Sequence, residues 1–235
     1  MVVPGTGGTV SEGASAWIDE GRARREDLFL QTKFTYQAGQ DHRLPYDPEA
    51  ALSAQVAQSV KSSLEHLGTD YIDSYVLHGP ASGRGWTDYD AEVWAAMARE
   101  RDAGRVRLLG VSNVSLRHLE DLATSGAEMP AFVQNRCFAR TGWDHSVRAF
   151  CARQQIRYQG FSLLTANPEV LHHPLVADIA ARSHATPAQV VFRFALAVRM
   201  LPLTGTTDAE HMRQDLVSPA VTLSSDEARA IESLA

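Results

Sequence analysis

The chain has 235 residues and a formal net charge of −6 at pH 7, with 44% apolar and 21% charged residues. This length allows a sizeable core and fits one large domain or two small ones, and the negative charge disfavours a nucleic-acid partner. No apolar run approaches the roughly 20 residues that span a bilayer, and residues 1–10 lack the regions of a secretory signal. The two cysteines, Cys137 and Cys151, suit a reducing compartment and have no metal-ligand spacing. We therefore expect a cytoplasmic protein without a metal site, whose thiols are buried and neutral.

The first half of the chain alternates short apolar runs with longer helical ones. Strands are predicted at 27–33, 71–78 and 106–113, and helices at 48–68, 90–104 and 115–126. Pro48 after Asp47 predicts the start of the first helix, and Gly68 predicts its end. Ser115 is the expected N-cap of the third helix.

The second half continues the same alternation. Strands are predicted at 131–137, 156–162 and 200–205, and helices near 143–154, 167–183, 186–198, 208–216 and 224–235. Thr186 followed by Pro187 predicts an N-cap with proline in the first helical position. Six strands, each followed by helical sequence, indicate an α/β fold with parallel strands. The units could form an open doubly wound sheet or most of a (β/α)8 barrel, and no Gly-x-Gly-x-x-Gly fingerprint is present.

Polar residues recur where the predicted strands end. In order, the ends carry Lys33, His78, Ser112-Asn113, Gln134-Asn135, Phe161-Ser162 and Thr204-Gly205-Thr206. In a barrel, functional residues collect at these carboxyl ends, although simple solvation also places polar residues there. His78 is accordingly either a strand cap or a catalytic imidazole.

The longest segment without periodicity, residues 35–50, follows Lys33. A long loop at this position favours a role in shaping a substrate pocket, and a tolerated surface insertion is the alternative. Within it, Asp41, His42 and Arg43 could bind a polar substrate or could simply be solvated.

Several stretches, taken in order, carry a family resemblance. They are "REDLFLQTK", "SLEHLGTDYIDSYVLH", "GRVRLLGVSNVSLRHLEDL", "FVQN", "TPAQVVFRFAL" and "LPLTGTTDAEHMRQDL". From about residue 12 to its end, the chain resembles the aldo-keto reductase superfamily. The resemblance implies a (β/α)8 TIM-type barrel forming a single domain over 1–235. It also implies NADPH, less often NADH, as the cofactor, and a small-molecule carbonyl as the substrate.

By the same resemblance, Lys33 and His78 occupy the positions of the family's catalytic lysine and histidine. In the family the lysine lowers the pKa of a tyrosine that protonates the carbonyl oxygen, and an aspartate pairs with the lysine. The histidine orients the carbonyl. The physical chemistry agrees, because a cation stabilises a phenolate and a neutral imidazole can donate to an oxygen that gains charge.

The cofactor positions carry over in the same way. Ser112, Asn113 and Gln134 match the residues that hold the nicotinamide carboxamide, and Phe161 matches the aromatic residue stacked on the nicotinamide ring. A core phenylalanine is the alternative for Phe161. Ser162 and Leu164 fall in the pyrophosphate segment, Gly205 and Thr206 near the 2′-phosphate, and Gln214 with Asp215 near the adenine. His211 stands where NADP-preferring members carry an arginine, and Arg213 is the candidate substitute.

The resemblance breaks off at the N-terminus. Two family βα units precede the strand that holds the lysine, and the second carries the aspartate and the tyrosine. Neither strand is recognisable before Arg24, where residues 8–23 resemble only the helix of the second unit, and the first tyrosine is Tyr36 in the loop after Lys33. The sequence therefore predicts an incomplete barrel of about six units, with open edges that favour self-association. Three functions follow: an NAD(P)H-dependent carbonyl reductase impaired by these losses, a non-catalytic nicotinamide-nucleotide-binding or regulatory protein, and an unrelated open α/β protein.

Overall fold

The computed structural model describes residue 18, residues 20–41 and residues 43–234. The chain divides into two compact units, which meet in sequence between Phe132 and Val133, and each unit is described by itself. The prediction of a single domain over 1–235 stays a prediction. The expectations for the first 17 residues and for His42 fall outside the described residues.

The strands of the described chain are short and follow one another between helices. Their bounds are β1 Gln31–Phe34, β2 Ile72–Leu77, β3 Val106–Ser112, β4 Phe132–Arg136, β5 Arg157–Phe161 and β6 Met200–Pro202. In the first unit β1 pairs with β2 and β2 with β3, and in the second unit β5 pairs with β6, always in parallel. Each strand is followed by helical sequence, which confirms the predicted α/β class with its six parallel βα units.

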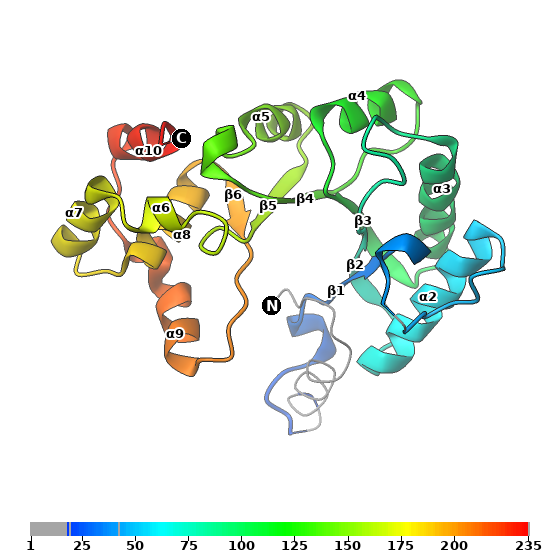
Figure 1. Cartoon of the computed structure of the whole chain (residues 1–235). Coiled ribbons are helices and arrows are strands. Elements are labelled where there is room, and N and C mark those ends of the chain that lie inside the picture. The colour runs from blue at the N-terminus through cyan, green and yellow to red at the C-terminus, as the bar shows by residue number, and fades with distance from the viewer. Residues whose placement is uncertain (1–17, 19, 42, 235) are drawn as a thin grey trace. The chain divides into compact units, whose positions relative to one another are not determined.

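Helices cover the outer side of the strands in the first unit. The helices of this unit are α2 Leu52–Leu67, α3 Asp88–Asp102 and α4 Leu116–Thr124. The unit also contains two short 3-10 turns, Arg25–Asp27 and Gln37–Gly39. Figure 1 shows α2 and α3 side by side along β2 and β3. The buried Tyr75 of β2 donates from its hydroxyl to Ser59 Oγ of α2 at 2.8 Å. The outer face of β2 is therefore fixed to α2.

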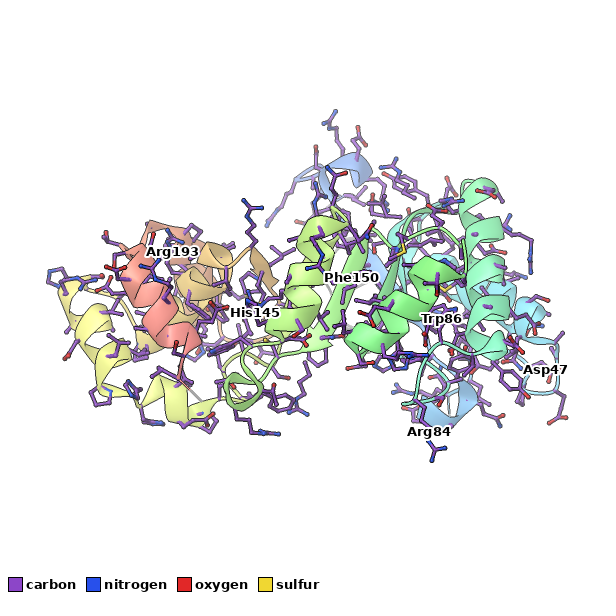
Figure 2. The ribbon with its side chains drawn as sticks, turned by 90° about the horizontal axis from the view of Figure 1, so that it is seen from above. Asp47, Arg84, Trp86, His145, Phe150 and Arg193 are labelled. Carbon is purple, nitrogen blue, oxygen red and sulfur yellow. The ribbon has the colours of Figure 1, made fainter. Side chains whose placement is uncertain are left out.

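The second unit is mainly helical. Its elements are the 3-10 turns Ala139–Thr141 and Ser218–Ala220 and the helices α5 His145–Arg153, α6 Pro168–Leu171, α7 Pro174–Arg182, α8 Pro187–Ala197, α9 Ala209–Val217 and α10 Ser225–Glu232. Figure 2 shows α5 with His145 at its start and Phe150 further along. Trp143, fully buried just before α5, packs against Phe194 of α8 with ring centroids 4.9 Å apart. Its indole N–H donates to the carbonyl of Ile231 at 3.2 Å, so one aromatic side chain joins α5, α8 and α10.

The last strand ends at Pro202 and not at Gly205, so Thr204 and Thr206 lie in the loop after it. Three other predicted boundaries are wrong for local reasons. The first strand starts at Gln31 because residues 25–27 form a 3-10 turn. The first helix starts at Leu52, not at Pro48, because the Asp47 carboxylate closes a turn by accepting from the N–H of Glu49 at 3.0 Å. The helix predicted over 167–183 is two helices, α6 and α7. Pro174 keeps the preceding residue out of helical conformation, and His173 is extended at φ −71° and ψ 135°.

The predicted helix caps are confirmed. The Ser115 and Thr186 side chains cap α4 and α8, and Gly68 ends α2 at φ 60°. The structure also confirms that Cys137 and Cys151 are buried and free. Burial raises the pKa of each thiol to about 12, so both are neutral.

Candidate functional site

The register of β1 and β2 places the two predicted catalytic side chains on one face. Lys33 lies opposite Val76, and the ladder continues through a hydrogen bond of 2.8 Å from the N–H of His78 to the carbonyl of Phe34. His78 therefore stands opposite Thr35. Because side chains alternate along a strand, Lys33, Thr35 and His78 share a face, which we call the Lys33–His78 face. This face also carries the pair Gln31 and Ser74, which are joined at 2.9 Å.

Lys33 is half-buried near the end of β1. Within the described residues, no hydrogen bond or ion pair reaches its ammonium group. Burial lowers the pKa of Lys33 below its ordinary value, because the charged form loses solvation. The site therefore holds a cation whose charge is poorly stabilised.

His78 makes hydrogen bonds to residues that follow both neighbouring strands, one from its ring and one from its backbone. Its Nδ1 lies 3.0 Å from the Thr35 hydroxyl, and its backbone carbonyl accepts from the Asn113 amide at 2.7 Å. His78 is exposed by its accessible surface, but it is still partly desolvated. This partial burial, followed by the charge of Lys33, lowers the pKa of His78. A neutral ring with Nδ1 bound to Thr35 leaves Nε2 as the ring nitrogen that can meet a ligand.

Ser112 and Asn113 are the two predicted cofactor residues that belong to this same unit. Ser112 is the last residue of β3 and is fully buried. Asn113 follows in left-handed conformation at φ 55°, is exposed, and uses one amide hydrogen on His78. The structure thus brings Ser112 and Asn113 to the strand ends that carry Lys33 and His78.

The Tyr36 hydroxyl is committed to a buried carboxylate that the sequence reasoning missed. It donates to Asp90 Oδ1 at 2.9 Å, and burial, followed by the charge of Asp90, raises the pKa of Tyr36. The same carboxylate accepts from the N–H groups of Ala81 at 2.7 Å and Thr87 at 2.9 Å. Asp90 therefore joins the loops after β1 and β2 to the start of α3. The Thr-x-x-Asp spacing of Thr87 and Asp90 was the available sequence signal.

The loop after β2 is anchored on its other side as well. The N–H of Trp86 donates to Asp121 Oδ2 of α4 at 3.2 Å, and the Trp86 ring meets Trp94 edge-on at 6.2 Å. Figure 2 shows Trp86 within the unit, while Arg84 of the same loop extends from the surface. The loop that follows His78 is therefore fixed at both ends.

In the second unit, Gln134 of β4 is paired with a residue that the sequence reasoning did not single out. Its amide donates to Gln159 Oε1 of β5 at 3.0 Å. Gln159 is fully buried, and its Nε2 has no hydrogen-bond partner within the described residues. A buried donor beside a predicted carboxamide-binding glutamine fits a polar ligand group.

The three predicted residues at the end of β5 lie at one turn. Phe161 ends the strand, and Ser162 follows in left-handed conformation at φ 57°. Phe161, Ser162 and Leu164 are all half-buried. The fully buried Asn167 fixes this turn. Its amide donates to the carbonyls of Cys137 at 3.0 Å and Leu163 at 2.9 Å, and its Oδ1 accepts from the N–H of Ala139 at 2.6 Å.

The remaining predicted cofactor residues lie in the loop before α9 and on α9 itself. The Thr206 hydroxyl accepts from the N–H of Asp208 at 3.1 Å, next to the exposed Gly205. Arg213 is exposed and pairs with Glu210, which also accepts from Gln214 Nε2 at 3.3 Å. The predicted phosphate-binding arginine is thus already engaged by a carboxylate. Whether the residues of both units form one cofactor site stays a prediction.

Other parts of the described chain are weaker candidates for a functional site. A hollow of about 460 Å³ lies at the amino ends of the strands, away from Lys33, and Asp73 on its wall is paired with Arg25 and Arg107. In the loop after β1, Asp41 and Arg43 pair with each other. No cluster of three metal-ligating side chains occurs among the described residues. Within the same residues, no helix is long and apolar enough to cross a membrane.

Sequence comparison places this arrangement in a family. The sequence model of the Aldo/keto reductase family matches residues 8–235, and the chain therefore belongs to that family. It is 29% identical over 225 residues to the uncharacterized oxidoreductase YtbE of Bacillus subtilis, covering 96% of this chain and 74% of that protein. It is 31% identical over 186 residues to 2,5-diketo-D-gluconic acid reductase B of a Corynebacterium species, covering 77% and 64%.

Solved structures show the same fold. The aldo-keto reductase MGS-M4 from a deep-sea metagenome library has a TM-score of 0.80 at 22% identity, with 95% of this chain and 77% of that chain covered. The thermostable aldo-keto reductase Tm1743 has a TM-score of 0.78 at 24% identity, with 97% and 78% covered. The predicted fold class, a (β/α)8-barrel type with about six recognisable units, is confirmed.

Proposed function

We propose that this protein reduces the carbonyl group of small aldehydes or ketones with a nicotinamide nucleotide. The observation that carries the proposal is the Lys33–His78 face, where register places a half-buried ammonium and a neutral imidazole on adjacent strands. The family membership of the chain and the oxidoreductases among its relatives support the same chemistry. We further propose that the chain is a single barrel domain that acts in the cytoplasm.

The two side chains act on the carbonyl oxygen. As hydride adds to the carbonyl carbon, negative charge develops on oxygen, and the Lys33 ammonium stabilises it at close range. The exposed His78 can donate from Nε2 to the same oxygen in the tautomer in which the Thr35 hydroxyl donates to Nδ1. The lowered pKa of His78 keeps the ring neutral near pH 7, so that it contributes a hydrogen bond rather than a second charge.

The cofactor supplies the hydride when it is bound. We propose that Ser112, Asn113 and Gln134 hold its carboxamide, and the unpartnered Nε2 of Gln159 fits this assignment because it is a buried donor beside Gln134. Phe161 would pack on the nicotinamide ring. Ser162, Leu164, Gly205, Thr206 and Gln214 would contact the pyrophosphate and the adenosine.

We propose NADPH as the preferred cofactor and NADH as the alternative. Arg213 is the candidate partner of the 2′-phosphate, but its ion pair with Glu210 opposes this role. Asp208 adds a further carboxylate, whose pKa is lowered by the backbone N–H groups of His211 and Glu210. Glu210→Gln would release Arg213, and we expect it to lower the KM for NADPH more than that for NADH.

A non-catalytic nucleotide-binding or regulatory role is the second candidate. One observation favours it: four of the six tyrosine hydroxyls donate to protein groups, namely those of Tyr36, Tyr46, Tyr75 and Tyr158. Of the other two, Tyr71 lies under two arginines and Tyr89 is exposed on α3. None of these arrangements offers a phenolic proton at Lys33, so the proton would come from water. Loss of a positioned acid costs on the order of 10²–10⁴-fold in rate.

Cofactor absorbance and cofactor fluorescence, followed together with a panel of aldehydes, separate the two candidates. Consumption of NADPH that is lost in Lys33→Met and His78→Ala supports the reductase. The matched control is Lys61→Met, which changes the only other lysine of the chain on an exposed face of α2. Binding without consumption would support the regulatory role instead, and consumption that survives Lys33→Met would refute the assigned site.

A further inference from the structure

The chain contains only two lysines, and their environments differ. The Lys61 side chain is 77% exposed on α2 with Glu65 at 3.8 Å, whereas Lys33 is half-buried. No carboxylate in the described part of the chain pairs with Lys33. An amine in such surroundings loses its proton more readily than a solvated one. It is also open to solvent at the carboxyl end of a strand, which is where ligands bind in this class of fold.

We propose that Lys33 is a nucleophilic amine that forms a Schiff base with small aldehydes at the Lys33–His78 face. This reaction uses the carbonyl substrate class of the proposed function but needs neither the nicotinamide nucleotide nor a phenolic acid. It is therefore a second activity of the same face.

The chemistry balances without an oxidant or a reductant. The lone pair of the neutral Lys33 Nζ attacks the carbonyl carbon, the π electrons move to oxygen, and one proton passes from nitrogen to that oxygen to give a carbinolamine. The hydroxyl is then protonated and leaves as water while the nitrogen lone pair forms the carbon–nitrogen double bond, and the iminium nitrogen returns its remaining proton to solvent. The aldehyde and the amine thus give one imine and one water.

The surroundings of Lys33 suit both steps. Opposite Lys33 in the register, Val76 of β2 is fully buried and apolar, which favours the neutral amine over the ammonium. The charged or titratable group that interacts with Lys33 from the neighbouring strand is His78, two residues beyond Val76 on the same face. His78 is the group that can exchange a proton with the departing hydroxyl, because its Nε2 is not used by Thr35.

Reductive trapping tests the proposal on the full chain. The protein is incubated with propanal and sodium cyanoborohydride near pH 7, without nicotinamide nucleotide, and the modified peptides are identified by mass spectrometry. We expect a propyl adduct at Lys33 in about fivefold or greater excess over Lys61, since reactivity follows the fraction of free amine. The terminal α-amino group, with a pKa near 8 in peptides, serves as the internal reference.

Two conservative variants complete the experiment. Lys33→Arg keeps the positive charge but cannot form a trapped secondary amine in this way, so it should lose the adduct, while Lys61→Arg should retain it. Equal trapping at the two lysines, or an unmodified Lys33, overturns the proposal. Because no cofactor is present, trapping at Lys33 in a protein that fails to oxidise NADPH would refute the proposed reductase and leave the Schiff base standing.

Discussion

Replacing Lys33 with methionine should stabilise this protein while removing its proposed chemistry. The ammonium is half-buried and makes no hydrogen bond or ion pair with the described residues, and Lys33 lies opposite the apolar Val76 in the β1–β2 register. Methionine has a similar length and no charge, so it can fill the same space.

The gain in stability can be estimated from the free-energy cost of burying a polar group without a hydrogen-bond partner. That cost is about 1–3 kcal/mol in proteins, and the partial exposure of Lys33 favours the lower half of the range. A chain of 150–250 residues gains about 2–4 °C in Tm per kcal/mol. We therefore expect Lys33→Met to raise the Tm by about 2–8 °C near pH 7.

The pH dependence of the Tm tests independently whether the charge of Lys33 destabilises the folded protein. The pKa of Lys33 is lowered in the folded protein from its ordinary 10.5. The free-energy cost of burying the Lys33 ammonium is therefore fully present below the pKa of the folded protein. It disappears above pH 10.5, where the amine is neutral in both the folded and the unfolded state. Calorimetric Tm values of the wild type and Lys33→Met should differ most near pH 7 and converge as the pH approaches 10.5.

Lys61→Met is the control for non-specific effects of losing a lysine, and it should leave the Tm nearly unchanged because Lys61 is largely solvated. A Tm for Lys33→Met at or below that of the wild type would refute the reasoning. It would mean that the ammonium is stabilised in the folded state.

Three further outcomes follow from the contacts around the site. Thr35→Val should lower kcat for aldehyde reduction about three- to tenfold, the worth of one hydrogen bond, and Thr35→Ser should restore it. Wild-type stability should fall as the pH drops below about 6.5, because the folded pKa of His78 is lowered and the unfolded chain binds the proton first; denaturation of His78→Asn should show a smaller fall. Asp90→Asn should cost about 2–3 kcal/mol in urea unfolding, and Tyr36→Phe about 1 kcal/mol, because Asp90 also accepts from two backbone N–H groups; equal losses would contradict this.

The elements that the sequence could predict are those fixed by local chemistry. The strand ends at Lys33 and His78 were predictable within one residue, because apolar runs stop there. Ser115 and Thr186 were predictable as caps because a cap needs only a hydroxyl and a following N–H. The start of α2 was not, since Asp47 satisfies a turn and a helix cap equally well in sequence, and the choice depends on the chain around it.

The partners of the site residues were beyond sequence reasoning, because they come from distant elements. The sequence placed Tyr36 in the loop after Lys33, but nothing local indicated that Asp90, 54 residues away, accepts the hydrogen bond of its hydroxyl. The same applies to Gln159, whose buried amide is joined to Gln134 only because β4 and β5 bring them together.

Those partners decide what the two strand-end residues can do. A lysine beside a carboxylate and a tyrosine would be a fixed ammonium that serves the tyrosine. In the described part of this chain Lys33 has a lowered pKa and no counter-charge, while the Tyr36 hydroxyl donates to Asp90. The missing counter-charge is what favours amine chemistry at Lys33. Reductive trapping and NADPH consumption measure amine chemistry and carbonyl reduction separately, so they can establish which chemistry the Lys33–His78 face performs.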